Sequence, residues 1–173
     1  FTYYYVVTST NSSNVESGFS NEAFATPSAQ STSVINVPDD YPTIQEAINA
    51  ASSGDQIYIS AGTYYVNDLY INKDLTISGA GTSSTYLSGS GIHRIMTISS
   101  PGNSTLEISN FTITDGNALS NSGYVVGFVN DNDYSVTEFE NIVFQNSGGG
   151  TGNTLFRGNG WDTTTYRNCI VRN

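Results

Sequence analysis

A short segment occurs four times in this chain, and this repeat restricts the possible folds more than any other feature. The copies begin at residues 75, 106, 137 and 164, so they are spaced by 31, 31 and 27 residues. They read Leu75-Thr-Ile-Ser-Gly79, Leu106-Glu-Ile-Ser-Asn110, Thr137-Glu-Phe-Glu-Asn141 and Thr164-Thr-Tyr-Arg-Asn168. A period in this range is typical of proteins built from stacked structural repeats.

The apolar pattern of each copy changes parity at its last residue, which is Gly79, Asn110, Asn141 or Asn168. Leu or Thr lies four positions before this residue and an apolar residue lies two positions before it. After each corner Asn, by contrast, apolar residues lie one and three positions on. Because a straight strand keeps one parity, we predict a one-residue corner between two short strands. Gly and Asn tolerate the left-handed conformation that such a corner needs. Stacked corner asparagines are expected to hydrogen-bond to one another.

A third strand is predicted before each of the later copies. Ile98, Val129 and Phe156 each lie eight residues before the start of a copy, within apolar runs, and we predict that they are equivalent. Three strands per turn, stacked turn on turn, would form parallel sheets along the sides of a coil.

The repeat resembles the right-handed parallel β-helix proteins of the pectin-lyase-like superfamily. Residues 34–64 are similar to the opening cap and first coil of many members, so the resemblance covers residues 34–173. It implies an all-β fold, namely a right-handed parallel β-helix with a short N-terminal capping helix, preceded by a β-hairpin extension. Members include polysaccharide lyases, esterases, epimerases, adhesins and viral fibres, so the fold does not decide the activity.

The expected β-helix begins with a cap at residues 34–55, and its coils follow at residues 56–173. Thr43 and Glu46 have the spacing of a capping box, and Ile44 and the apolar residues after it share one helical face. A short helix there would cover the first coil and protect its edge strands. The last coil is expected to be open.

Residues 1–27 differ from the rest in pattern and are predicted to be two strands joined by a turn at residues 11–14. They resemble the last two strands of a fibronectin type III domain, with Tyr3 in the place of that family's corner tyrosine. An isolated hairpin is marginally stable in water, so a further element must pair with it. An upstream segment, a neighbouring subunit and the side of the coil remain open alternatives. Residues 28–33 form a polar linker.

Charge excludes several classes of partner. Only 12% of the residues are charged and the net charge is −10. Seven acidic residues and no Lys or Arg precede Lys73, so a nucleic acid or an anionic membrane surface would be repelled. No apolar run approaches 18 residues, so membrane insertion is not expected. The composition, poor in charge and rich in hydroxyl and amide groups, indicates an extracellular or cell-surface protein.

Both ends of the chain suggest that it associates with further protein. Residue 1 is Phe and no signal peptide is visible, so the chain is expected to be processed or part of a longer polypeptide. The final repeat copy is expected to leave an unpaired strand edge. Two interpretations remain open: a subunit whose copies complement one another by strand addition, and a piece of a large multidomain protein.

No catalytic residues are predicted. Lyases and esterases of the superfamily use acidic clusters with Arg or Lys, whereas the acidic residues here are interpreted as scattered. The cationic pair His93-Arg94 has no identifiable partner in the sequence and is interpreted as a solvated loop pair. Cys169 aligns with buried positions of the repeat, so we expect it to pack against the core.

Three residues are candidates for ligand binding. Asp131 and Asp133 alternate with asparagines and are candidate calcium ligands, although a solvated turn is favoured because the turn glycine and distal Glu of an EF-hand are absent. Trp161 lies between small residues and is a candidate for stacking on a sugar ring, or else it covers the flank of the coil. Asn11 and Asn103 begin triplets that match the N-glycosylation pattern.

Two functional hypotheses follow. The first is an extracellular structural or adhesive β-helix without an active site in this chain, which self-assembles into a surface filament and contacts polysaccharide through Tyr and Trp on its sides. The second is the N-terminal part of a carbohydrate-active enzyme, similar to a polysaccharide lyase or epimerase, whose catalytic coils lie beyond residue 173. The enzyme question stays open at this point, with the residues favouring the first hypothesis.

Overall fold

The computed structural model describes residues 3–25, 32–99, 105–117, 124–128, 136–145, 154–157 and 163–172. The chain divides into two compact units, Phe1–Ser31 and Thr32–Asn173. Within the described residues, no helix is both long enough and apolar enough to cross a membrane.

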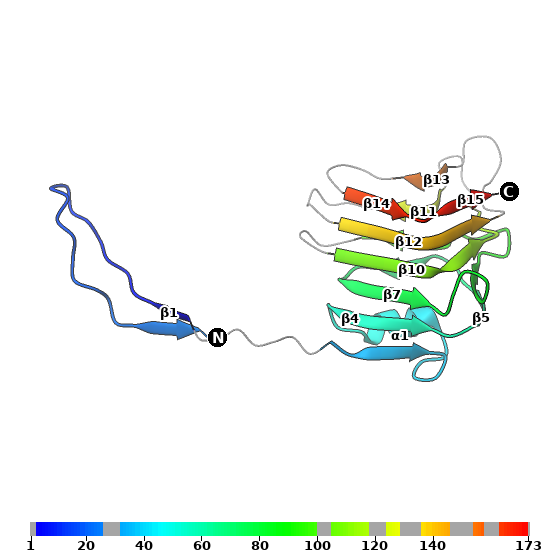
Figure 1. Cartoon of the computed structure of the whole chain (residues 1–173), viewed down its shortest axis with the longest axis horizontal. Coiled ribbons are helices and arrows are strands. Elements are labelled where there is room, and N and C mark those ends of the chain that lie inside the picture. Colours follow the sequence, from blue (N-terminus) through cyan, green and yellow to red (C-terminus); the bar gives the residue numbers. More distant parts are fainter. Residues whose placement is uncertain are drawn as a thin grey trace. The chain divides into compact units, whose positions relative to one another are not determined.

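The smaller unit is an antiparallel hairpin. Strand β1 (Tyr3–Tyr5) pairs with β2 (Ala23–Ala25) (Figure 1). The side-chain oxygen of Asn11 organises the turn by accepting hydrogen bonds from the N–H groups of Ser13 at 2.9 Å and Val15 at 3.0 Å. The predicted order of strand, turn and strand is therefore present, although regular pairing covers only a few residues.

The larger unit is mostly β-structure with one helix among its described residues. All strand pairings among its described residues are parallel, so the prediction of an all-β chain with parallel sheets is confirmed. Its elements are β3 (Val34–Val37), α1 (Ile44–Ala50), β4 (Asp55–Ile59), β5 (Gly62–Tyr65), β6 (Leu69–Ile71), β7 (Leu75–Gly79), β8 (Thr85–Ser88), β9 (Met96–Ile98), β10 (Thr105–Thr114), β11 (Tyr124–Phe128), β12 (Val136–Gln145), β13 (Thr154–Arg157), β14 (Thr163–Arg167) and β15 (Ile170–Arg172).

The strands form three columns that the chain visits in turn. The first column has the order β3-β4-β7-β10-β12-β14, and its strands lie one above another in Figure 1. The second column runs from β5 through β8 and the second halves of β10 and β12 to β15. The third column is β6-β9-β11-β13. Each passage through the three columns therefore adds one layer of strands.

The four repeat copies lie side by side in the first column, as predicted. Leu75 is opposite Leu106, Leu106 is opposite Thr137, and Thr137 is opposite Thr164. The unequal spacing of 31, 31 and 27 residues leaves this register unchanged, because the shorter interval is absorbed between the strands.

The corner asparagines adopt the predicted left-handed backbone. The φ angles are 64° at Asn110, 52° at Asn141 and 51° at Asn168. The side-chain amide of Asn141 donates a hydrogen bond of 3.2 Å to the side-chain oxygen of Asn110, so the expected contact between stacked corners is present for this pair. β10 and β12 run through their corners as single strands whose pairing omits the corner residue.

Gly79 occupies the corner for a different reason than predicted. It is not among the glycines with positive φ, so the left-handed prediction is wrong at this position. A Cβ atom added there would lie 2.5 Å from the carbonyl oxygen of Asn110 and 2.9 Å from the Cβ of Phe111. Close approach of the next layer, not backbone conformation, therefore requires glycine.

The third column exists, but its predicted register is wrong. Ile98 lies opposite Phe128, and Phe156 lies opposite Val126, whereas the sequence spacing had aligned Ile98, Val129 and Phe156. Val129 itself lies outside the described residues. Pairing between layers sets this register, and the lengths of the connections to the first column differ from layer to layer.

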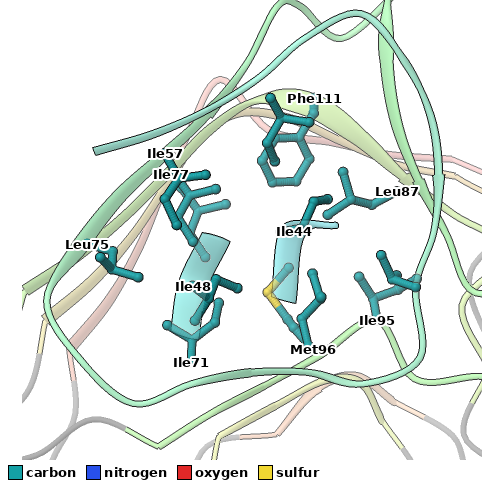
Figure 2. Close-up of a cluster of buried hydrophobic side chains, with 14 of the residues drawn as sticks. Ile44, Ile48, Ile57, Ile71, Leu75, Ile77, Leu87, Ile95, Met96 and Phe111 are labelled. Carbon is teal, nitrogen blue, oxygen red and sulfur yellow. The ribbon is translucent and has the colours of Figure 1, made fainter. Parts of the chain in front are cut away.

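The side chains of the strands alternate between the interior and the surface. In β4 every second residue is buried, and Ile57 and Ile59 are completely so. Figure 2 shows Ile44 and Ile48 of α1 within a ring of apolar side chains from the surrounding strands. Each fully buried side chain of this size stabilises the fold by about 1.5–3 kcal/mol. One interior column is Ile57, Ile77, Ile108 and Phe139.

Helix α1 begins with the predicted capping box. The Thr43 hydroxyl accepts a hydrogen bond of 3.2 Å from the N–H of Glu46, and the Glu46 carboxylate accepts one of 3.1 Å from the N–H of Thr43. The side chain of Lys73 donates a hydrogen bond of 2.9 Å to the carbonyl oxygen of Ala51, and so provides a donor for a carbonyl group at the C-terminal end of the helix.

Candidate functional site

The residues that the sequence singled out as ligands lie outside the described part of the chain. These are Trp161, Asp131 and Asp133, together with the glycosylation candidate Asn103. Sugar stacking and calcium binding at these positions remain predictions. Among the described residues, no group of three or more His, Cys, Asp or Glu side chains is arranged to hold a metal ion.

A groove of about 590 Å³ lies on the outer face of the second column. Its described lining includes two tyrosines, the four hydroxyl groups of Thr63, Ser88, Ser90 and Thr114, and the carboxylate of Asp115. The side chains that define it are Thr63, Tyr65, Tyr86, Ser88, Thr114 and Asp115. We refer to it as the tyrosine groove.

Strand pairing explains why these residues share one face. β5 and β8 place Thr63 opposite Tyr86 and Tyr65 opposite Ser88. Leu87, between the two outward residues of β8, is only 1% exposed and points into the core. Because side chains alternate along a strand, its neighbours Tyr86 and Ser88 lie on the opposite face, toward the groove.

The two tyrosines flank the groove from neighbouring strands. Tyr65 is 77% exposed, so its ring is open to a ligand. The Tyr86 hydroxyl donates a hydrogen bond of 3.2 Å to the carbonyl oxygen of Ser83, which holds the ring in place. One strand spacing and two residues along the strand separate the two positions, which corresponds to roughly 8 Å between their backbones.

The floor of the groove carries hydroxyl groups and a carboxylate. Thr114 lies opposite Ser88 in the next layer. The Ser88 hydroxyl accepts a hydrogen bond of 3.2 Å from the N–H of Ser90, and the Thr114 hydroxyl donates one of 3.0 Å to the Asp115 carboxylate. Ser88 and Thr114 are largely buried, so their orientations are set by the fold.

The loop beside the floor is held by backbone hydrogen bonds. The N–H of Gly91 donates to the carbonyl oxygen of Asp115 at 2.7 Å, and that of Gly89 donates to the carbonyl oxygen of Thr114 at 3.1 Å. A Cβ atom at Gly89 would lie 2.4 Å from the carbonyl oxygen of His93, so only glycine fits there. These hydrogen bonds and the close packing at Gly89 hold the loop beside the groove in place.

A second depression, of about 420 Å³, adjoins the tyrosine groove. The two share Thr63 and Tyr65, so the Tyr65 ring stands between them. Gln45 and Asn67 contribute amide groups to the second depression, and Pro42 contributes an apolar surface.

Acidic residues gather on the outer face of the first column, which corrects the interpretation that they are scattered. Glu107 and Glu138 lie opposite each other on β10 and β12. Together with Glu140 they line a depression of about 340 Å³. Arg167 forms an ion pair of 2.8 Å with Glu138. The Arg167 side chain is 60% exposed, and exposed ion pairs contribute little to stability.

Arg94 has partners, contrary to the interpretation of a solvated loop pair. Its guanidinium contacts the carboxylate of Asp68 at 3.3 Å and donates to the hydroxyl of Thr97 at 2.9 Å. Thr97 in turn donates to the same carboxylate. Asp68 has a φ of 54°, so this network secures a turn between β5 and β6.

Sequence reasoning named tyrosines only as a class of possible polysaccharide contacts and singled out Trp161, but not Tyr65 or Tyr86. Their alternation with inward residues was a signal that both rings face outward. Their proximity to Asp115 was not readable, because β5, β8 and the end of β10 are brought together only by pairing between layers.

No protein-family model matches the chain. No curated protein has significant sequence similarity to it either. The function must therefore be inferred from the geometry of the chain itself.

Proposed function

We propose that the protein is an extracellular or cell-surface structural or adhesive protein built on a right-handed parallel β-helix. In this proposal copies of the chain self-associate and the outer faces of the β-helix contact polysaccharide. Residues 1–27 act as a hairpin similar to the end of a fibronectin type III domain, and a polar linker at residues 28–33 joins them to the β-helix.

Three observations support the β-helix. The chain passes through three parallel columns in a fixed order, the repeat copies are in register, and the corner asparagines have left-handed backbones. The resemblance to the pectin-lyase-like superfamily rests on the same repeat and on the cap. Helix α1 covers one end of the stack through its contacts with β3, β4 and β6.

Self-association is supported above all by the exposed apolar side chains of the hairpin. Tyr4, Val7, Phe19 and Phe24 are 64%, 69%, 77% and 72% exposed. A two-stranded hairpin is marginally stable alone, and exposed apolar clusters mark surfaces that bind protein. A partner strand or sheet would remove these side chains from water.

The strands β14 and β15 offer a matching surface. Within the described residues, each pairs with β12 on one side only. Tyr166 lies opposite the buried Phe139 of β12, and Val171 lies opposite the buried Phe144. Tyr166 and Val171 are nevertheless 43% and 67% exposed. The Tyr166 ring stacks on Phe139 at 5.4 Å, and burial together with nearby Cys169 raises the pKa of Tyr166 to about 12.

We propose that the hairpin of one copy adds to the β14 and β15 strands of the next. Both surfaces expose apolar side chains on short strands, and recognition by strand addition uses surfaces of this kind. The partly buried Cys169, which packs against the core as expected, belongs to the surface beside Tyr166.

Light scattering during size-exclusion chromatography tests this assembly. We expect the full chain to form species whose masses are multiples of 18.5 kDa and increase with concentration. Phe24→Asp and Val171→Asp should each shift the population to the single 18.5 kDa species, because each places a charge in an apolar contact. Val34→Asp, at a comparably exposed valine outside both surfaces, should leave the distribution unchanged.

A chain of 18.5 kDa at every concentration would contradict self-association. The enzyme hypothesis predicts a different result. A larger intact polypeptide containing this chain and degrading pectate or alginate would favour an enzyme whose catalytic coils lie outside this sequence.

A further inference from the structure

We propose that the tyrosine groove binds an uncharged saccharide chain. This inference deepens the polysaccharide contact of the proposed function and is independent of self-association. It names a site that the residues singled out from the sequence do not include, and it narrows the ligand to an uncharged saccharide.

The first argument is the pair of tyrosine rings. The Tyr65 ring is largely exposed, and the Tyr86 ring is tethered through its hydroxyl to Ser83. An aromatic ring offers an apolar face that fits the C–H face of a sugar ring, while its hydroxyl stays available for hydrogen bonds. Two such rings on neighbouring strands provide two contact surfaces for one ligand.

The second argument is the hydrogen-bonding capacity between the rings. Thr63, Ser88, Ser90 and Thr114 contribute hydroxyl groups, which both donate and accept. The Ser88 hydroxyl accepts from the Ser90 N–H, and its own proton has no acceptor among the described residues. A saccharide presents hydroxyl groups that also donate and accept, so the two surfaces are complementary.

The third argument is charge. Asp115 is the only charged residue among the described residues that line the tyrosine groove and the adjoining depression. A carboxylate accepts hydrogen bonds from sugar hydroxyls but repels sulfate, phosphate and uronate groups. The net charge of −10 acts in the same direction. The charge of this surface therefore excludes anionic saccharides.

The fourth argument is the shape of the surface. The depressions on the two sides of Tyr65 have volumes of about 590 and 420 Å³ and share Thr63 and Tyr65. A single sugar would occupy one side only, whereas a chain can pass across the ring and use both. The amide group of Asn67 then extends the polar contacts beyond Tyr65, whereas the Gln45 amide is bonded to the backbone of Tyr70.

The fifth argument is rigidity. The loop of Gly89 and Gly91 is bonded to the backbone of Thr114 and Asp115, and Asn117 donates to the carbonyl oxygen of Gly91 at 2.8 Å. A preformed groove loses little conformational entropy when a ligand binds, which favours affinity.

Isothermal titration calorimetry of the full chain tests the proposal. The probes are uncharged β-1,4-linked hexasaccharides of glucose, mannose, xylose and galactose, with hexagalacturonate as the anionic probe. We expect at least one uncharged probe to bind and hexagalacturonate not to bind. Tyr65→Ala should weaken this binding about tenfold, as the loss of one aromatic contact implies. Tyr65→Phe should keep most of the affinity.

Tyr58→Ala is the matched control. Tyr58 is 39% exposed and lies on β4 in the first column, away from the lining of the groove, so its replacement should not change affinity. Equal losses for Tyr58→Ala and Tyr65→Ala, binding of hexagalacturonate alone, or no binding by any uncharged probe would overturn the proposal. Binding of a proline-rich peptide in place of the saccharides would also overturn it, since aromatic grooves recognise such peptides too.

Light scattering on the same samples separates this proposal from self-association. A variant that loses saccharide binding at unchanged mass identifies the groove. Masses that stay at 18.5 kDa while saccharide binding persists contradict the assembly and leave the groove supported.

Discussion

The corner asparagines show how one residue type meets two requirements at once. Their left-handed backbones turn the chain between two strands, and the side-chain bond from Asn141 to Asn110 links successive layers. Asn is suited to this position because its short polar side chain tolerates positive φ and still reaches a neighbour. The repeat therefore encodes both the corner and its stacking.

Replacing Asn141 separates these two contributions. Asn141→Ala should lower the free energy of unfolding by about 1–3 kcal/mol, because it loses a hydrogen bond and places Ala in a left-handed conformation. Asn141→Gly should cost less, since Gly adopts the φ of 52° without strain. Urea denaturation measures both. Equal losses of unfolding free energy in the two variants would show that the left-handed backbone conformation makes no contribution.

Gly79 provides the corresponding test for close packing. Gly79→Ala should destabilise the larger unit by about 1–3 kcal/mol, because the new methyl group would meet the backbone oxygen of Asn110 at 2.5 Å. Gly18→Ala has no atom within 4 Å of the added Cβ and should change stability by less than about 0.5 kcal/mol. Thermal unfolding of both variants checks the difference, and a neutral Gly79→Ala would contradict the argument.

At the scale of elements, helix α1 takes the place of a strand at the end of the third column. The Gln45 side chain accepts a hydrogen bond of 2.8 Å from the N–H of Tyr70 and donates one of 3.2 Å to its carbonyl oxygen. An amide side chain thus pairs with the edge of β6 as a neighbouring backbone would. Edge strands that are covered in this way do not pair with other chains.

Gln45→Ala should therefore lower the free energy of unfolding by about 1–3 kcal/mol through the loss of two hydrogen bonds. Gln56→Ala is the control, because Gln56 is an exposed residue of β4 and should contribute less than about 0.5 kcal/mol. Chemical denaturation gives both values. Increased aggregation of Gln45→Ala would be a second sign that the edge of β6 has been uncovered.

At the scale of the whole molecule, Asp55 joins segments that are distant in sequence. Its carboxylate accepts hydrogen bonds of 2.8 Å from the N–H groups of Ser33 and Ser52, before β3 and after α1. These bonds, from Ser33 first and then Ser52, lower the pKa of Asp55, with a smaller contribution from the charge of Lys73.

This lowered pKa predicts acid sensitivity. Because the folded pKa lies below the unfolded value of 3.8, the stabilisation is present above about pH 4 and is lost as the pH falls through the folded pKa. The free energy of unfolding of the natural chain should therefore exceed that of Asp55→Asn near neutral pH, and the difference should shrink below pH 4. Asp39→Asn, at an exposed turn, is the control. A difference that is constant with pH would refute the linkage.

Much of the fold was readable from the sequence. The repeat predicted parallel strands in register at Leu75 and Leu106, and the residue types predicted the corners and the capping box of Thr43. The third column was harder, since Ile98 pairs with Phe128 in spite of the repeat spacing. The candidate site was not predicted: the residues chosen were Trp161, Asp131 and Asp133, and Tyr65 was passed over.

The sequence by itself determined the features that depend on local or strictly periodic interactions. Left-handed corners, a capped helix and alternating burial follow from the conformations and polarities of neighbouring residues. Only the tertiary structure decided which surface residues meet, such as Tyr65 with Asp115 and Gln45 with Tyr70. These groupings arise from pairing between layers, which brings together side chains from separate passages of the chain.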